Sequence, residues 1–341
     1  MPVGARSENV LRTSRRVRSR PAWNRRAILA AAALLPAAPV LAAWPDRPAR
    51  LIVAYPAGGG TDLMARAVAQ KLTELLGQSV IVDNRSGGGG TVGTMAVAQA
   101  RPDGHTLLFA NGGEFALKPL MERNLPYDAN RDFDFVAMCG STPVVLAVNA
   151  QLPARNLREF LDLARARPGR INVSNSGTRS VMHLGAAYLA QRAGVELAHV
   201  PYRGAAPAVG DAAAGTVEAV VMGLPPILAQ ARDGRLRILA IMTPRRNNAV
   251  PDVPTLEELG FPGFDLSNSV GIATPRGVPP EVVATLNAAT NRAMADPGVR
   301  RIFLDNGAEP VTGTAQDYRD FLGAETERMR DVVRLAGVPA E

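Results

Sequence analysis

The stretch LIVAYPAGGGTDLMARAVAQKL, residues 51–72, reads as an apolar strand, a loop with three glycines and an amphipathic helix. From Thr61 onward, apolar residues recur three and four positions apart, and Gly77 follows as a helix stop signal. A glycine loop before a helix leaves backbone N–H groups free at the helix start, where they and the helix dipole favour an anion. The stretch therefore predicts a strand–loop–helix unit of an α/β protein, with an anion site at its turn.

Two further glycine loops follow strand patterns in the same way. One is NRSGGGGTVG, residues 84–93, and the other is SNSGTRS, residues 174–180. In parallel α/β sheets such loops lie at the carboxyl edge of the strands, where ligands bind. Three of them in one chain predict a ligand cleft rather than three unrelated turns.

Strand and helix patterns alternate along the chain, which predicts parallel sheets with helices on both faces. The expected strands lie near residues 50–55, 79–83, 105–110, 144–148, 171–173, 198–200, 217–222, 236–242 and 271–274. Asn156 with Glu159, and Thr255 with Glu258, have the capping-box spacing that opens a helix. The length of 341 residues exceeds what one such sheet usually holds, so we expect two lobes joined by continuous strands.

The positive charge is concentrated at the N-terminus. Residues 1–43 carry eight arginines and one glutamate, which accounts for the whole formal net charge of +7. The remainder is balanced, which excludes the electrostatic signature of a nucleic-acid-binding protein. A basic region, an Ala/Leu-rich stretch and small residues near Ala42 or Ala43 predict a cleaved signal peptide and export to a periplasm. Arg25 and Arg26 also resemble a twin-arginine signal, so the export route stays open.

The glycine loops lack the marks of a nucleotide site. A Walker motif needs Lys-Ser/Thr after its last glycine, whereas Thr61 and Asp62 follow Gly60. Residues 88–93 match G-x-G-x-x-G, and Glu114 lies at a spacing that suits a ribose acid, so a dinucleotide site stays an alternative. The run of four glycines makes a chance match easy, and the loop follows the second strand rather than the first. We therefore expect no cofactor.

The carboxylate of Asp62 bears on the kind of anion that the first loop accepts. It would repel a doubly charged phosphate, but it tolerates a singly charged carboxylate held by neighbouring donors. Two roles are open for it. Asp62 either caps free N–H groups of the first helical turn, or accepts a hydrogen bond from an amine or hydroxyl of the ligand.

No catalytic or metal-binding set stands out in the sequence. Cys139 is the only cysteine, which excludes an intramolecular disulfide and a Cys-rich zinc site. His105, His183 and His199 have no metal-ligand partner at helical spacing, and no G-x-S-x-G elbow is present. We interpret the histidines as structural and expect no metal. An exported hydrolase that uses His183 or His199 is the weaker alternative.

Segments with the pattern of a known family extend from residue 44 almost to the C-terminus. They are YPAGGGTDLMARAVAQKL, GQSVIVDNRSGGGGTVGTMAVAQARPDGHTLLFAN, LPYDANRDFDFVA, HVPYRGAAPAVGDAAAGTVEAVV, GRLRILAIMTPRRNNAVPDVPTLEELGFPGF and ATPRGVPPEVVATLNAA. With these segments in order, the chain resembles the Bug-type, TctC-like periplasmic substrate-binding proteins of tripartite tricarboxylate transporters. The resemblance implies a two-lobed type II periplasmic-binding-protein fold, each lobe a mostly parallel sheet flanked by helices, with crossing strands between the lobes. We expect one lobe from 44–143 plus 269–341, and the other from 144–268.

The resemblance also implies where the ligand lies. In such proteins a ligand carboxylate is held largely by backbone donors of the first loops, and the second lobe supplies the far end. The predicted ligand-binding residues are Tyr55, Ala57, Gly58, Gly59, Thr61, Asp62, Gly89, Gly90, Thr91, Ser176, Gly177, Arg179, Ser180, Tyr202, Arg203, Gly204, Pro207 and Asp211. Arg179 stands where glycine is common, and Val181 where a hydroxyl is common. These departures suit a more distant second acid group, or an aromatic or aliphatic acid, better than a standard small dicarboxylate.

The implied function is that of a periplasmic solute-binding protein without catalytic activity. It would capture a small carboxylate-bearing metabolite between its lobes and deliver it to the subunits of a membrane transporter. We expect a monomer. A ligand-loaded sensor that presents its closed form to a membrane receptor kinase stays an alternative.

Overall fold

The computed structural model describes residues 44–340, so the predicted signal peptide and its cleavage site lie outside the described residues. In the described part, ten strands form one sheet with the order β2-β1-β3-β9-β4-β7-β5-β6, and β8 and β10 also pair with β4. The strands are β1 (Ala49–Val53), β2 (Val80–Asn84), β3 (Thr106–Asn111), β4 (Phe133–Asn149), β5 (Asn172–Asn175), β6 (Ala198–Pro201), β7 (Ala219–Gly223), β8 (Leu236–Ile241), β9 (Ser267–Pro275) and β10 (Glu309–Pro310).

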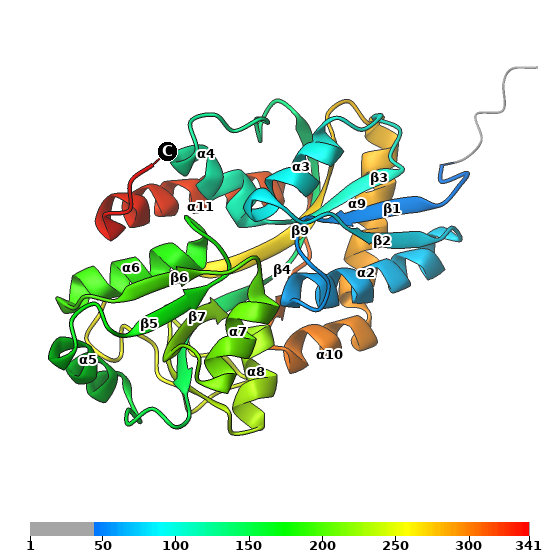
Figure 1. Cartoon of the computed structure of the whole chain (residues 1–341). Coiled ribbons are helices and arrows are strands. Elements are labelled where there is room, and N and C mark those ends of the chain that lie inside the picture. Colours follow the sequence, from blue (N-terminus) through cyan, green and yellow to red (C-terminus); the bar gives the residue numbers. More distant parts are fainter. Residues whose placement is uncertain (1–43, 341) are drawn as a thin grey trace, which may run out of the picture. The chain divides into compact units, whose positions relative to one another are not determined.

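The long strand β4 divides the sheet into two halves. Residues 133–143 of β4 pair antiparallel with β9, which continues to β3, β1 and β2. Residues 144–149 pair instead with β7 and β8 of the other half. The chain therefore has the predicted two-lobed fold, with β4 and β9 passing between the lobes (Figure 1). The boundaries near 143 and 268 stay a prediction.

The pairing directions agree with the alternation of strands and helices in the sequence. β1 pairs parallel with β2 and β3, and β5 pairs parallel with β6 and β7. Parallel neighbours need a crossover, which the helices supply. Antiparallel pairing involves β4 and β9, the strands that cross between the lobes.

Helices cover the outer strands of both lobes. The helical elements are α2 (Gly60–Leu76), η1 (Gly88–Gly90), α3 (Thr91–Ala98), η2 (Gly113–Leu117), α4 (Lys118–Met121), α5 (Leu157–Ala166), α6 (Val181–Ala193), α7 (Ala205–Ala214), α8 (Leu224–Arg232), α9 (Pro280–Ala295), α10 (Pro297–Asp305) and α11 (Ala315–Ala336). Within the described residues, no helix is both long enough and apolar enough to cross a membrane.

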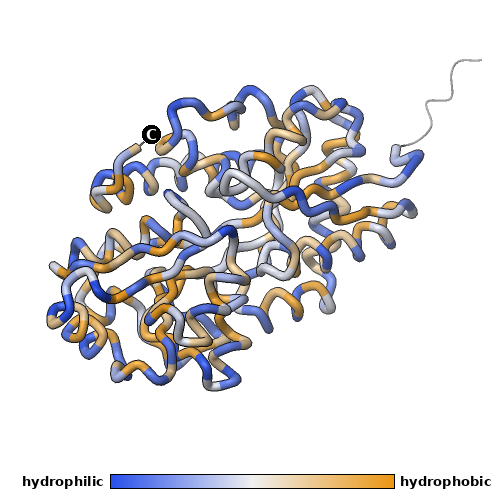
Figure 2. The backbone as a smooth tube through the Cα atoms, viewed as in Figure 1, coloured by the Kyte–Doolittle hydropathy of each residue, from blue (hydrophilic) through white to orange (hydrophobic). Residues whose placement is uncertain are grey.

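Alternate residues of β1 show why its sequence is apolar throughout. Leu51 and Val53 belong to one hydrophobic core, with α2 and α9, whereas Ile52 and Ala54 belong to another on the opposite face. A strand covered on both faces needs a continuous apolar run. The hydropathy colouring shows apolar residues recurring along the strands, with hydrophilic residues gathered at outward turns (Figure 2).

The first predicted unit forms as expected. α2 starts at Gly60 and ends at Leu76, where Gly77 adopts the left-handed conformation (φ 68°) and donates its N–H to Thr73 O. Asn156 caps α5, and its side chain accepts a hydrogen bond from Glu159 N at 2.9 Å.

One sequence prediction was incomplete and one was wrong. The strand expected near 144–148 is present, but β4 begins already at Phe133. Its first half was not recognised because glycine, proline and two register shifts interrupt the alternation there. Thr255 and Glu258 do form the reciprocal capping bonds, at 3.2 and 2.8 Å, yet turns follow instead of a helix. Gly260, with φ of 89°, ends the local structure before a helical turn can repeat.

Gly93 of α3 allows this helix to pack against the first strand–loop unit. A Cβ at this position would lie 2.7 Å from both Ala54 Cα and Arg85 O, which are backbone atoms that cannot easily give way. We expect Gly93→Ala to lower the free energy of unfolding by about 1–3 kcal/mol.

Gly323 of α11 is the matched control, since a Cβ there meets nothing within 4 Å. Gly323→Ala should raise the free energy of unfolding by about 0.5–1 kcal/mol, because alanine loses less backbone entropy. Urea unfolding of both variants measures the difference. Equal effects of the two substitutions would contradict the close packing of α3.

Candidate functional site

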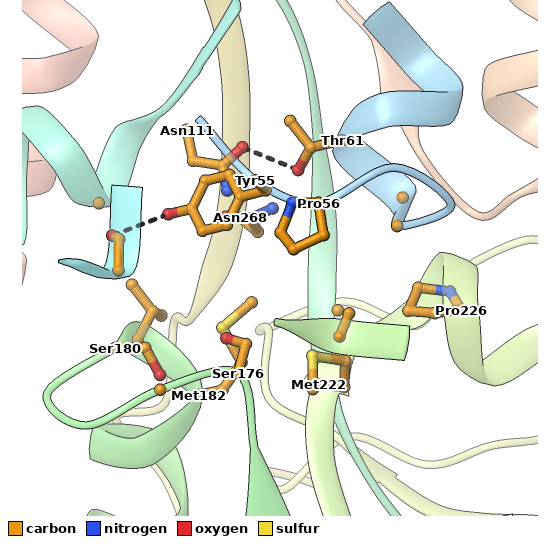
Figure 3. Close-up of a pocket in the computed structure, with 18 of the residues that line it drawn as sticks. Tyr55, Pro56, Thr61, Asn111, Ser176, Ser180, Met182, Met222, Pro226 and Asn268 are labelled. Atoms are coloured by element: carbon orange, nitrogen blue, oxygen red, sulfur yellow. Dashed lines mark hydrogen bonds between the residues drawn. The ribbon is translucent and has the colours of Figure 1, made fainter. Parts of the chain in front are cut away.

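A cavity of about 100 Å³ lies between the two lobes, at the carboxyl ends of their parallel strands (Figure 3). The first lobe supplies residues after β1, β2 and β3, and the second lobe supplies residues after β5, β6 and β7. Thr142 of β4 and Asn268 of β9 reach the cavity from the crossing strands. The cavity thus lies where ligands bind in open α/β sheets.

Several helices begin at the wall of this cavity. Gly59, Gly204 and Gly223 precede α2, α7 and α8, and within the described residues no side chain caps these three starts. Ser180 precedes α6 and accepts a hydrogen bond from His183 N at 3.2 Å. The first N–H groups of a helix have no partner inside the helix. Pro225 and Pro226 have no N–H in the first turn of α8, so the free backbone donors lie mainly at the starts of α2 and α7. Together with the helix dipoles, they make this cavity favourable for an anion.

The remaining wall is largely apolar. Polar groups face it at a few places, among them Thr61, whose hydroxyl donates to Asn111 Oδ1 at 3.0 Å (Figure 3). Two cationic side chains, Lys118 and Arg179, also line the cavity. The apolar side chains on the wall include Met64, Leu117, Val181, Met182, Met222, Pro207, Pro225 and Pro226. An acid with an aliphatic or aromatic body fits this mixture of groups.

Asp62 is buried and holds the first glycine loop in place. Its Oδ2 accepts from Gly58 N and Arg66 Nε, both at 3.0 Å, and its Oδ1 accepts from Asn84 Nδ2 at 3.0 Å. Burial opposes the charged form, but hydrogen bonds from Arg66, Gly58 and Asn84 outweigh it and lower the pKa of Asp62. Asp62 and Gly58 line a neighbouring hollow rather than the main cavity. None of these donors is an N–H group of the first turn of α2, so Asp62 holds the loop before the helix rather than capping the helix itself.

The loop before α6 has an unusual backbone. Arg179 has φ of 58°, in the left-handed region that non-glycine residues rarely adopt. Its N–H donates to His183 Nδ1 at 3.0 Å, and its Nε donates to Pro339 O at 3.2 Å. Arg179 thus connects the cavity wall to the segment that follows α11.

The structure brings ten of the predicted ligand residues together on the cavity wall. These are Tyr55, Ala57, Gly59, Thr61, Gly89, Ser176, Gly177, Arg179, Ser180 and Pro207. The other eight lie off this wall: Gly58, Asp62, Gly90, Thr91, Tyr202, Arg203, Gly204 and Asp211. Tyr202 donates its hydroxyl to Asp211 Oδ2 at 2.6 Å, which raises the pKa of Tyr202 to about 12 and clamps the loop before α7. Contact with a ligand stays a prediction for every residue of the set.

Sequence reasoning missed several cavity residues. Asn111 ends β3 and is followed by two glycines, which is the same signal as in the three loops that were recognised. Lys118 follows one turn later, and its Nζ donates to Gly88 O at 3.0 Å and to Glu122 Oε1 at 2.5 Å. Thr142, Met222 and Asn268 lie within strands or at their ends, where no local signal marks them.

The histidines make local packing contacts. The rings of His183 and His199 lie 5.0 Å apart, between their centroids. Burial lowers the pKa of His183 to about 4, so the ring is neutral near pH 7 and its Nδ1 accepts from Arg179 N. His105 lies beside Asp103 and Trp44, outside the cavity. Residues 44–340 contain no cluster of three or more His, Cys, Asp and Glu side chains that could hold a metal ion.

Two α/β lobes, crossing strands and a cavity walled by helix starts define a periplasmic-binding-protein fold. The chain belongs to the tripartite tricarboxylate transporter family of receptors, whose family model matches residues 64–338. The predicted resemblance is therefore confirmed. The members of this family are periplasmic solute-binding proteins.

Individual relatives match over nearly their whole length. The chain is 37% identical to Protein BugT of Bordetella pertussis over 303 residues, covering 88% of this chain and 93% of BugT. An R. palustris protein solved with adipate is 33% identical, with a TM-score of 0.84 over 87% of this chain and 99% of its own. MatC from Rhodopseudomonas palustris, solved with bound malate, is 32% identical, with a TM-score of 0.81 over 85% of this chain and 100% of its own.

Asp62→Ala tests the support that Asp62 gives to the first glycine loop. Removal of a buried carboxylate with three donors should lower the free energy of unfolding by about 1–3 kcal/mol at pH 7. Because the folded pKa of Asp62 is lowered, this stabilisation is present above the unfolded pKa of about 3.9 and is lost as pH falls below it. Unfolding curves at pH 7 and pH 3 should therefore show a difference between variant and wild type that shrinks in acid.

Asp331→Ala is the matched control, since its carboxylate is exposed and, among residues 44–340, forms an ion pair only with Arg334, at 3.0 Å. It should change the free energy of unfolding by less than about 1 kcal/mol. If Asp62→Ala lost no more free energy of unfolding than Asp331→Ala, Asp62 would not support the first glycine loop.

Proposed function

We propose that this chain is an exported solute-binding protein that holds a small organic acid by its carboxylate and delivers it to a tripartite tricarboxylate-type membrane transporter. The observation that carries the proposal is the convergence of the uncapped starts of α2 and α7 on one cavity, in a member of a family whose solved relatives contain adipate and malate. Backbone donors suit a carboxylate, and the buried Asp62 next to the first loop disfavours a doubly charged phosphate.

The side chains on the cavity wall favour some classes of organic acid over others. Met64, Met182 and Met222 offer flexible apolar contacts to the body of the ligand. Lys118 and Arg179 place positive charge at the wall, where a second acid group would be stabilised. We therefore propose an aliphatic or aromatic acid, with or without a second carboxylate, that is larger than the smallest dicarboxylates.

Closure of the two lobes would complete the site. The pairing of β4 changes from β9 to β7 and β8 near residue 143, which supports lobes of 44–143 plus 269–341 and of 144–268. A ligand that contacts both lobes stabilises the closed state by its differential affinity for that state. The protein acts as a monomer in this scheme and performs no covalent chemistry.

The N-terminal signal would direct the chain to the periplasm, with cleavage near Ala42 or Ala43. Sensing is the second candidate role, because a membrane receptor kinase could equally bind the closed, ligand-loaded form of the protein. The neighbouring genes separate the two roles, since transporter subunits and a kinase are different products.

A thermal-shift panel of mono-, di- and tricarboxylates tests the proposed ligand class. An acid present at about 100 times its Kd should add about 2.7 kcal/mol to the free energy of unfolding and raise the melting temperature accordingly. Mass spectrometry of acids that co-purify with the protein gives an independent identification. A panel in which no carboxylic acid, but an uncharged solute, raised the melting temperature would contradict the proposal.

Arg179→Gly tests which part of the ligand this arginine meets. Glycine removes the charge and also tolerates the left-handed backbone at this position, so strain does not obscure the result. We expect dicarboxylates to lose about tenfold or more in affinity relative to monocarboxylates of the same length. Isothermal titration with matched acid pairs measures the ratio, and an unchanged ratio would remove Arg179 from the site.

A further inference from the structure

A buried carboxylate lies directly behind the cavity wall. Glu114, in η2, is 0% exposed, and its Oε1 accepts a hydrogen bond from the hydroxyl of Tyr55, which lines the cavity. Its Oε2 accepts from Asn111 N at 2.6 Å. Neither donor carries a positive charge. Burial without a bonded cation disfavours ionisation and raises the pKa of Glu114 to about 7.

The charged and titratable groups around Glu114 do not reverse the rise in its pKa. Lys118, on α4, favours the ionised form from a distance, but its Nζ is bound to Glu122 Oε1 and Gly88 O. On the other sides lie Tyr127, whose hydroxyl donates to Glu114 O at 2.8 Å, and two residues of α11, Tyr318 and Glu325. Across the cavity, the titratable groups at the start of α6 are Arg179 and His183.

Tyr55 has a second acceptor within reach. Its hydroxyl oxygen lies 3.5 Å from Gly89 O, and Figure 3 draws this bond from Tyr55 to the segment of the second glycine loop. When Glu114 is ionised, the Tyr55 hydroxyl donates to Glu114. When Glu114 carries a proton on Oε1, that proton is donated to the Tyr55 oxygen, and the Tyr55 hydroxyl is free to donate to Gly89 O.

The second glycine loop lies tightly against this pair. A Cβ on Gly90 would lie 2.7 Å from Glu114 Oε1 and 3.2 Å from the Tyr55 oxygen. A change in the hydrogen bond between Glu114 and Tyr55 is therefore transmitted to the loop, in which Gly89 lines the cavity. A negative ligand in the cavity also repels a negative Glu114, so bound acid and proton favour each other.

We propose, on the basis of the proposed carboxylate-binding function, that Glu114 is a positioning residue that couples capture of the acid to the uptake of one proton from solvent. The proton resides on Glu114 Oε1, and the Tyr55 hydroxyl turns toward Gly89 O to hold the second glycine loop in its ligand-binding form. The ionised protein holds the acid more weakly.

Isothermal titration with adipate tests the coupling. Between pH 6 and pH 8.5, Kd should rise by up to tenfold per pH unit once Glu114 ionises, the limit for uptake of a single proton. Titrations in buffers of low and high ionisation enthalpy should show up to one proton taken up per adipate. Glu114→Gln, whose amide imitates the protonated acid, should bind adipate tightly at every pH with no proton uptake.

Glu325→Gln is the matched control. Glu325 is also a buried glutamate, 3% exposed, whose pKa is raised to about 7, but its carboxylate accepts from Ser269 Oγ instead of a cavity residue. This variant should keep the pH dependence and the proton uptake of the wild type. Loss of both effects in Glu325→Gln, or their persistence in Glu114→Gln, would overturn the proposal.

A ligand-free measurement separates this proposal from the proposed function. In a ¹³C NMR titration of the unliganded protein, the Glu114 carboxyl signal, identified by its absence in Glu114→Gln, should have its midpoint near neutral pH. The amide signals of Gly89 and Gly90 should follow the same midpoint, and should cease to follow it in Tyr55→Phe. A midpoint below pH 5, or loop amides that ignore Glu114, would overturn the proposal. Failure of adipate and of every other acid in the thermal-shift panel to bind at any pH would count against the proposed function alone.

Discussion

The antiparallel pairing of β4 with β9 extends over nine residue pairs and carries both strands from one lobe into the other. Beyond residue 143, β4 pairs with β7 and β8, so one strand belongs to both halves of the sheet in succession. This continuity brings the carboxyl ends of β1, β2 and β3 opposite those of β5, β6 and β7. The cavity, the helix starts around it and the contacts of its loops all depend on that arrangement.

Glycine has two different structural roles at the carboxyl edge of the strands. At the starts of α2 and α7 it leaves N–H groups without a side-chain cap, because no side chain of residues 44–340 caps these two helices. At Gly90 and Gly93 it allows close packing, since a Cβ would meet atoms 2.7 Å away. The uncapped N–H groups favour an anion at this edge. The close packing holds α3 and the second glycine loop against the strands, so that the donors keep a fixed geometry.

The sequence allowed the fold class and the loops to be predicted because their signals are local. Apolar periodicity, Gly77 and the glycine runs each act within one strand–loop–helix unit, and the family pattern placed the units in order. The first half of β4 was missed because its partners lie far along the chain and its bulges break the alternation. Met222 and Asn268 reach the cavity through the sheet topology, which no window of sequence contains. Glu114 was considered as a ribose acid, and only its burial behind Tyr55 shows that its oxygens face the protein.

Backbone donors hold any carboxylate, so they cannot by themselves distinguish one acid from another. Discrimination between acids therefore falls to the side chains that complete the cavity. In the proposed site, Met182 and Met222 would determine which apolar bodies fit, and Lys118 and Arg179 would determine whether a second charge is accommodated. The charge of the buried Glu114 sets the potential behind this wall. Under this proposal, a backbone cradle of this kind can serve different acids without any change in its glycine loops.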